Sequence, residues 1–169
     1  NDLTAESVDR SLLSIKPEQT DFSIIVFLPD GKRTILVCRG DSRLTNEDIA
    51  WEKLDSGWFY VSSLEGNLDL VEEIIKFGND KNIKIAWNPG KKELVQKDRI
   101  ISLAKQVEVF NVNRAESEAL FGFYLDQDDF WEKAKRLSLA NLVVTDGRNG
   151  AYLLTEGNKI FLPSPDQDP

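Results

Sequence analysis

Two stretches of the sequence decide the expected fold: VEVFNVNRAESEALFG, residues Val107–Gly122, and TDGRNG, residues Thr145–Gly150. The first stretch passes from an apolar strand pattern directly into the tetrapeptide Asn113–Glu116 and then into a helical pattern. The second stretch is a glycine-bearing turn that follows another apolar strand pattern. Open α/β sheets bind ligands where their strands end, so polar residues at these two points indicate a ligand site. An amide, a carboxylate and a glycine turn together suit a phosphate and its metal ion.

Outward from these stretches, the chain from Trp58 onward alternates short apolar runs with amphipathic segments. The apolar runs predict strands at Trp58–Ser62, Ile83–Trp87, Val107–Val112 and Leu142–Thr145, and a hairpin of Ala151–Thr155 with Lys159–Leu162. The amphipathic segments predict helices at Asn67–Phe77 (stopped by Gly78), Glu93–Lys105, Ala115–Phe121 and Asp126–Leu139. This alternation predicts an α/β fold with a mainly parallel, Rossmann-like sheet, right-handed crossovers and flanking helices.

The N-terminal third carries a different pattern, that of a β-hairpin. Two β-branched runs, Phe22–Leu28 and Arg33–Arg39, flank the turn sequence Pro29–Lys32. Both faces of the predicted hairpin carry apolar residues, so we interpret one face as a cover for a ligand and the other as a packing surface for a second subunit. Short helices are predicted on either side of it, at Leu3–Ile15 and Asn46–Leu54.

Composition excludes several classes of function. The 169 residues carry a net charge of −8 without a basic cluster, which argues against nucleic-acid binding. No apolar run approaches membrane-spanning length, and the single cysteine, Cys38, favours a reducing compartment, so we expect a cytoplasmic protein with no membrane contact. The sequence has no histidine, which excludes Ser-His-Asp hydrolysis and histidine-based zinc sites. It also has no methionine, which suggests a piece of a longer chain.

The Asn113-x-x-Glu116 pattern has two interpretations. An asparagine at the N-cap of a helix with a glutamate three residues later forms a capping box, a common structural device. At the end of a buried strand, the carboxylate can instead hold a metal-bound water while the amide donates to a phosphate oxygen. The two interpretations are compatible, and both remain open.

The other candidate residues also have structural alternatives. The Thr145–Gly150 turn either connects two strands or, through bare glycine backbone and the Thr145 hydroxyl, admits a nucleotide phosphate. Glu65 and Asn88 each follow a predicted strand, where ligands bind in α/β folds, although Asn-Pro-Gly is equally a turn signal. Arg39, next to the hairpin, has a solvated surface charge as its ordinary explanation.

Five motifs occur in a fixed order along the chain: DGKRTILVCRG, WFYVSSLEGN, IKIAWNPG, VEVFNVNRAESEALFG and LVVTDGRNGAYLL. In this order they resemble the ribokinase-like (PfkB) carbohydrate kinase family, collinearly over essentially all 169 residues. The resemblance implies one incomplete ribokinase-like α/β domain over residues 1–169, with a small β-hairpin lid and loop at residues 20–45. It also implies ATP-dependent phosphorylation of a sugar or nucleoside hydroxyl with Mg²⁺, and a homodimer formed through the lid.

The resemblance further implies roles for individual residues. In the family, the Asn-x-x-Glu motif positions phosphate and magnesium, which assigns Asn113 to the phosphate and Glu116 to the metal. Contacts to ATP are assigned to the turn residues Thr145, Asp146, Gly147, Arg148, Asn149 and Gly150. The sugar or sugar-derivative substrate is assigned to Glu65 and Arg39, with Asn88 at the same rim.

Two family features have no counterpart in the sequence. The Gly-Ala-Gly-Asp segment supplies the aspartate base and the anion hole, and the N-terminal strands carry Gly-Gly and Asn motifs that bind sugar. Phosphoryl transfer needs a base and charge stabilisation, so we expect the chain to be an incomplete and inactive portion of a sugar kinase. The alternative is a noncatalytic nucleotide- or sugar-binding or dimerisation module. A Rossmann-type oxidoreductase ranks below both, because no Gly-x-Gly-x-x-Gly follows the first strand.

Overall fold

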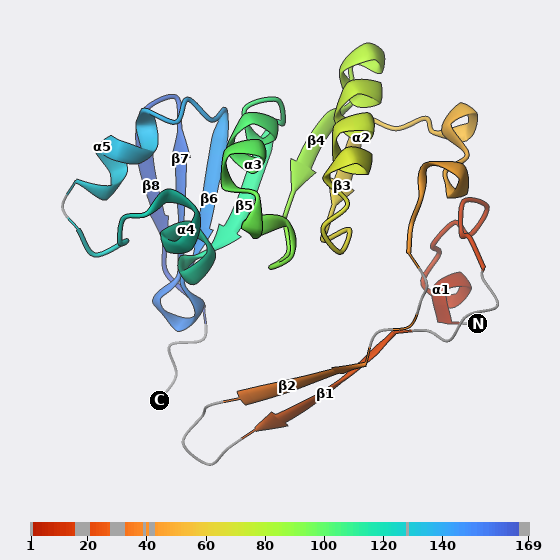
Figure 1. Cartoon of the computed structure of the whole chain (residues 1–169), viewed down its shortest axis with the longest axis horizontal. Helices are drawn as coiled ribbons and strands as arrows, with labels where there is room; N and C mark the ends of the chain where they lie inside the picture. The colour runs from red at the N-terminus through yellow and green to blue at the C-terminus, as the bar shows by residue number, and fades with distance from the viewer. Residues whose placement is uncertain are drawn as a thin grey trace. The chain divides into compact units, whose positions relative to one another are not determined.

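The computed structural model describes residues 2–15, 21–27, 33–38, 40, 43–127 and 129–165. The chain divides into two compact units, Asn1–Leu54 and Asp55–Pro169 (Figure 1). Each unit is described by itself.

The first unit contains the predicted hairpin. Strand β1, Phe22–Phe27, pairs antiparallel with β2, Arg33–Cys38, and Phe22 lies opposite Cys38 in the register. All residues of β1 are exposed, in agreement with a hairpin that carries apolar residues on both faces. The predicted turn and Arg39 lie outside the described residues.

The predicted helices of the first unit are shorter than expected. Helix α1 spans only Asp2–Ala5, because Ser7 adopts a left-handed conformation (φ 59°) and Asp9 then accepts hydrogen bonds from Ser11, which favours a turn. The segment predicted as a helix at Asn46–Leu54 forms two separate 3₁₀ turns, η1 at Asn46–Asp48 and η2 at Trp51–Lys53. The extended backbone of Ile49 separates them.

The second unit is built on a six-stranded sheet, which confirms the predicted α/β class. The strands are β3 Trp58–Val61, β4 Lys84–Trp87, β5 Val109–Asn113, β6 Asn141–Thr145, β7 Ala151–Thr155 and β8 Asn158–Leu162. They lie in sequence order across the sheet. Strands β3 to β6 are parallel, and β7 and β8 continue the sheet as an antiparallel hairpin.

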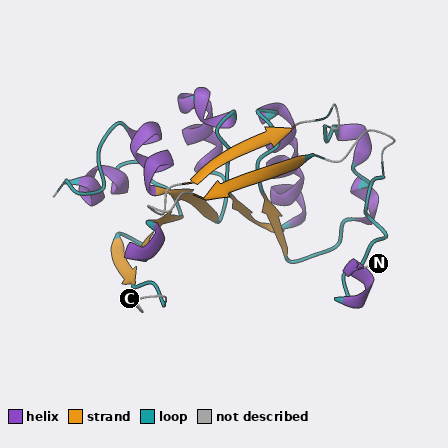
Figure 2. Cartoon of the chain, turned by 90° about the horizontal axis from the view of Figure 1, so that it is seen from below, coloured by secondary structure: helices purple, strands orange, loops and turns teal. Residues whose placement is uncertain are grey.

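Four helices of this unit gather on one face of the sheet, as Figures 1 and 2 show: α2 Leu68–Lys81, α3 Lys97–Ala104, α4 Arg114–Phe121 and α5 Phe130–Lys135. Two 3₁₀ turns, η3 at Glu93–Val95 and η4 at Gly147–Asn149, follow strand ends. The core under these helices is formed by alternate strand residues, Ile85, Trp87, Phe110, Val112, Leu142 and Val144, each at most 2% exposed. The intervening residues of the same strands are half-buried or exposed, so the described helices bury a single face. No helix among the described residues combines the length and apolarity needed to cross a membrane.

Three predicted helices of this unit differ from the observed ones by more than one residue. Helix α2 continues through Gly78 to Lys81 and ends at the left-handed Asn82 (φ 56°). Gly78 instead allows close packing, since a Cβ there would lie 2.7 Å from Ile85 Cδ1. The predicted Glu93–Lys105 helix breaks at Gln96 (ψ 63°) into η3 and α3. Helix α5 spans a shorter segment than the predicted Asp126–Leu139, and the left-handed Ser138 (φ 55°) lies just past its end.

Candidate functional site

The carboxyl ends of β3, β4, β5 and β6 lie along one edge of the sheet, the lower edge in Figure 1. The register pairs Val61 with Trp87 and Asn113 with Thr145, so the loops after all four strands emerge on the same side. Adjacent strands lie ~4.8 Å apart, which puts the ends of β3 and β6 roughly 14 Å from each other. This edge is where ligands bind in open α/β sheets.

Asn113 and Glu116 form a capping box at the start of α4. The Glu116 N–H donates to Asn113 Oδ1 (2.9 Å), and the Asn113 N–H donates to Glu116 Oε2 (2.9 Å). The motif therefore forms the capping box, and this leaves one Glu116 oxygen and the Asn113 NH₂ group available for a ligand. Within the described residues no hydrogen bond engages Glu116 Oε1 or the Asn113 side-chain NH₂ group, and Asn113 is exposed.

The turn Thr145–Gly150, here named the glycine corner, lies directly beside this cap, because Thr145 is the register partner of Asn113. The corner closes through an Asp146 N–H bond to the Gly150 carbonyl (2.8 Å). Gly150 has a φ of 102°, and a Cβ on it would lie 2.3 Å from the Leu162 carbonyl oxygen, so no other residue fits there without a shift of the backbone. The six assigned turn residues thus form one tight corner next to Asn113.

Arg114 connects the cap to the corner. Its guanidinium donates to Asp146 Oδ2 (3.2 Å), to Glu118 Oε1 (3.1 Å) and to Asp126 Oδ2. These hydrogen bonds, that to Asp126 first, raise the pKa of Arg114 above its ordinary value, so the side chain stays charged. Asp146 also accepts from Asn149 (3.1 Å), which turns its carboxylate into the corner. Asp146 therefore shapes the corner.

Glu65 and Asn88 lie at the other end of the same edge. Glu65 adopts a left-handed conformation (φ 57°), and its carboxylate pairs with Lys92 Nζ at 2.7 Å. The Asn88 side chain donates to the Asn111 carbonyl (2.8 Å) and so ties the loop after β4 to β5. Arg39, the remaining residue assigned to the substrate, lies outside the described residues, so its role stays a prediction.

Two residues of this edge escaped the sequence analysis. Glu93 is fully buried and accepts hydrogen bonds from the loops after β3 and β4. An acidic residue at a helix start is ordinary, so the sequence carries no sign of this burial. Arg114 lies inside the Asn-x-x-Glu motif, but its partners Asp126 and Asp146 are 12 and 32 residues away.

A magnesium ion fits the donor set through one carboxylate. Mg²⁺ usually keeps several waters and binds one or two carboxylates together with substrate phosphates. Glu116 has one oxygen in the cap and the other uncommitted, which allows this kind of contact. No cluster of three Cys, Asp or Glu residues suited to a metal occurs in the described part of the chain, so a cage made of protein ligands alone does not form there.

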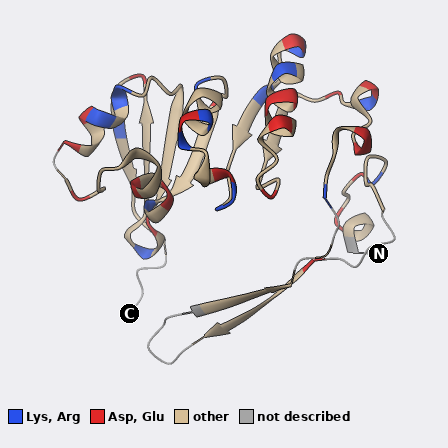
Figure 3. Cartoon of the chain, in the orientation of Figure 1, with Lys and Arg blue, Asp and Glu red and all other residues tan. Residues whose placement is uncertain are grey.

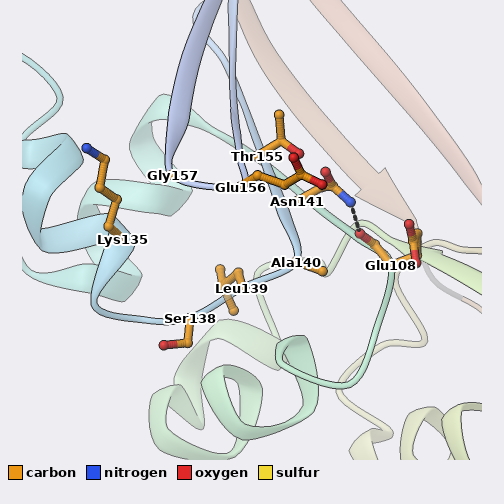
Figure 4. A pocket seen from close by; sticks show the side chains of 9 residues that line it. All are labelled: Glu108, Lys135, Ser138, Leu139, Ala140, Asn141, Thr155, Glu156 and Gly157. Atoms are coloured by element: carbon orange, nitrogen blue, oxygen red, sulfur yellow. Dashed lines mark hydrogen bonds between the residues drawn. The ribbon is translucent and has the colours of Figure 1, made fainter.

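The remaining surface offers weaker candidates. A cavity of about 520 Å³ (Figure 4) lies at the opposite edge of the sheet, where Glu108 precedes β5 and Asn141 begins β6. Its Lys135 and Glu108 side chains already pair with Glu132 and Lys84, and its Asn141 side chain donates to the Glu108 carbonyl (2.7 Å). Figure 3 shows Lys and Arg interspersed with Asp and Glu over the described helices, which is unlike a nucleic-acid-binding strip.

Comparison with known proteins gives the following matches. The family model described as "pfkB family carbohydrate kinase" matches residues 1–169. A deoxyribokinase of Salmonella typhi is 30% identical over 142 residues, which cover 80% of this chain and 45% of the relative. The chain therefore spans about half the length of the curated relatives that it matches.

Solved structures share the fold. The PfkB protein from Polaromonas sp. JS666 superposes with a TM-score of 0.76 at 16% identity, over 96% of this chain and 60% of that one. Fructokinase from Vibrio cholerae O395, solved with fructose, ADP and a calcium ion, superposes with a TM-score of 0.72 at 20% identity, over 99% of this chain and 58% of that one.

Proposed function

Since the chain belongs to the pfkB family of carbohydrate kinases, we propose that it serves the ATP-dependent phosphorylation of a hydroxyl group on a sugar or related carbohydrate, with Mg²⁺. The observation that carries this proposal is the pairing of Asn113 with Thr145 at neighbouring strand ends. It gathers an amide, the Glu116 carboxylate and the backbone of Gly147, where an added Cβ would meet nothing within 4 Å, at one place, a combination that suits a metal-bound phosphate chain.

The corner supplies part of the positioning and, together with Mg²⁺, part of the charge neutralisation that phosphoryl transfer needs. In this assignment the Asn113 amide donates to a phosphate oxygen, and Glu116 Oε1 holds Mg²⁺ through its water shell. Magnesium neutralises charge on the phosphates when it is bound. The residues of the Thr145–Gly150 corner line the nucleotide, and Arg114 keeps the corner against α4 through Asp146.

The substrate lies at the other end of the edge in this proposal. The Glu65 carboxylate accepts hydrogen bonds from sugar hydroxyls, and Asn88 offers its side-chain oxygen, since its NH₂ group is engaged with Asn111. The strand spacing of roughly 14 Å between β3 and β6 leaves room for a sugar next to a triphosphate. Arg39 is proposed as a further substrate contact from the lid. The deoxyribokinase relative makes 2-deoxyribose the first sugar to test.

We propose that the chain by itself does not turn over substrate, because none of its assigned residues serves as the base for the attacking hydroxyl. We also propose a homodimer through the hairpin, whose β1 residues are exposed and largely apolar. A cytoplasmic location suits the use of ATP and the exposed free thiol of Cys38.

The test is ADP formation by the full-length protein with 2-deoxyribose, ribose and fructose, at several Mg²⁺ concentrations. The expected result is Mg²⁺-dependent turnover of at least one sugar. Glu116→Gln keeps an oxygen for the cap but loses the metal-binding charge, so turnover should fall roughly hundredfold. Glu108→Gln, the same change at the opposite edge, is the control and should leave turnover unchanged. Full activity of Glu116→Gln would contradict the metal assignment.

The noncatalytic alternative rests on the exposed hairpin. If the hairpin serves only assembly, sedimentation will show dimers, and calorimetric titration with ATP and Mg²⁺ will give no heat. Heat of ATP binding together with sugar phosphorylation excludes this alternative.

A further inference from the structure

Glu93 is a fully buried carboxylate at the edge that carries Glu65. Its side chain is 0% exposed, and it is the first residue of η3, in the loop region after β4. Burial of an acidic side chain costs free energy unless hydrogen bonds compensate for the lost water. In the part of the chain that the structure describes, the donors around Glu93 are neutral groups, so hydrogen bonds alone provide this compensation.

These hydrogen bonds join two loops. Glu93 Oε1 accepts from the Leu64 N–H (2.6 Å), which belongs to the loop after β3. Glu93 Oε2 accepts from the Gly90 N–H (3.0 Å), which belongs to the loop after β4. The Ser63 hydroxyl lies within hydrogen-bond distance of both oxygens, at 3.2 and 3.1 Å. The loops also touch directly, because a Cβ on Gly90 would lie 2.2 Å from Ser63 Oγ.

The same bonds control the residue that follows Leu64. The Ser63 hydroxyl accepts the N–H of Glu65 at 3.3 Å, so one oxygen atom links the Glu93 carboxylate to the Glu65 backbone. Glu65 has a left-handed backbone, which costs a non-glycine residue free energy and persists only when its surroundings hold it. The Glu65 side chain is held as well, by Lys92, the residue before Glu93.

We propose that Glu93 is a positioning residue for sugar binding: it fixes the backbone and side-chain orientation of Glu65 at the edge of the sheet. This inference rests on the proposed function, in which Glu65 accepts hydrogen bonds from sugar hydroxyls. Glu93 itself is buried and does not contact the substrate. Its removal should therefore weaken sugar binding through Glu65 and leave the nucleotide corner, at the end of β6, unchanged.

The experiment measures KM for the sugar and for ATP in the full-length protein. Glu93→Gln keeps the size of the side chain but turns an NH₂ group toward one of the two main-chain N–H donors, so one loop loses its anchor. The expected result is a rise of roughly tenfold in the sugar KM, with the ATP KM within about twofold of its original value. Glu108→Gln is the matched control and should change neither constant.

A double-mutant cycle separates positioning from general destabilisation. If Glu93 acts through Glu65, the effect of Glu93→Gln on the sugar KM should disappear in a Glu65→Gln background. If Glu93→Gln does not fold, Ser63→Ala provides the same test, since it removes the hydroxyl between the two residues and leaves the main-chain bonds to Glu93.

Each outcome decides a different point. Absence of phosphorylation by the unsubstituted full-length protein would overturn the proposed function, and this inference with it. Phosphorylation whose sugar KM responds to Glu65→Gln but not to Glu93→Gln or Ser63→Ala would overturn the positioning role alone. Equal rises in the sugar and ATP KM values, or additive effects in the cycle, would assign Glu93 a purely structural role and also overturn it.

Discussion

Replacing Gly150 by alanine tests whether the corner is as tightly packed as the structure shows. The backbone of Gly150 has φ 102° and ψ −153°, a region that side chains rarely adopt. The new Cβ would lie 2.3 Å from the Leu162 carbonyl oxygen and 3.0 Å from Pro163 Cα, both backbone atoms that cannot turn away as a flexible side chain does.

The size of the effect follows from two costs and one offset. Backbone strain at such a position costs about 1–3 kcal/mol. Overpacking against the backbone costs roughly another 1–3 kcal/mol. Loss of glycine flexibility in the unfolded chain offsets about 0.4–1 kcal/mol. The free energy of unfolding should therefore fall by about 3 kcal/mol, which lowers Tm by roughly 6–12 °C for a domain of 150–250 residues and by less for a longer one.

The assay is thermal unfolding of the full-length protein, followed by circular dichroism, together with the KM for ATP. Gly157→Ala is the matched control, because Gly157 also has a positive φ (77°) but nothing within 4 Å of the added Cβ. It should lower the free energy of unfolding by only about 1 kcal/mol. Equal Tm values for the two variants would show that the close contact at Gly150 does not exist.

Three further substitutions test the cap, the bridge and the helix packing. Asn113→Asp keeps a capping oxygen but replaces the amide donor with a negative charge. Tm should therefore change by less than about 3 °C, whereas the KM for ATP should rise roughly tenfold. An unchanged KM for ATP would leave Asn113 only its capping role. Arg114→Ala removes the bridge to Asp146 and should raise the ATP KM roughly fivefold, with no change in the sugar KM; equal changes in both would contradict a local role. Gly78→Ala places a methyl group 2.7 Å from Ile85 Cδ1 of β4. The free energy of unfolding, measured in urea, should fall by about 1 kcal/mol, because the cost of overpacking exceeds the gain in helix propensity. A stabilised variant would refute the close packing.

Local sequence patterns predicted the secondary structure well where tertiary packing did not oppose them. The alternation of apolar runs and amphipathic segments predicted the order of strands and helices in the second unit, and the turn chemistry predicted both hairpins. Asn67 caps α2 and Gly122 ends α4 in a left-handed conformation, in line with the capping preferences of asparagine and glycine. The predictions were wrong at Gly78, which a helix-stop rule places at an end but packing places inside a helix.

The candidate site divides in the same way. The capping box of Asn113 and Glu116 spans three residues, so its geometry could be predicted from sequence. The pairing of Asn113 with Thr145 requires β5 and β6 to be neighbours in the sheet. The structure shows that they are, whereas the sequence does not state the strand order. No local pattern identifies Glu93 as buried, because its partners are set by the packing of two loops.

The sequence by itself determined the class of fold, the order of its elements and, to within one residue, the carboxyl ends of the strands in the second unit, because these depend on side-chain periodicity and on capping within about four residues. Only the tertiary structure decided which strand ends meet, where Arg114 finds its acidic partners and why Glu93 is buried. Those features depend on contacts between residues 12 to 32 positions apart, and the free energy of such contacts is settled when the sheet and its loops pack together.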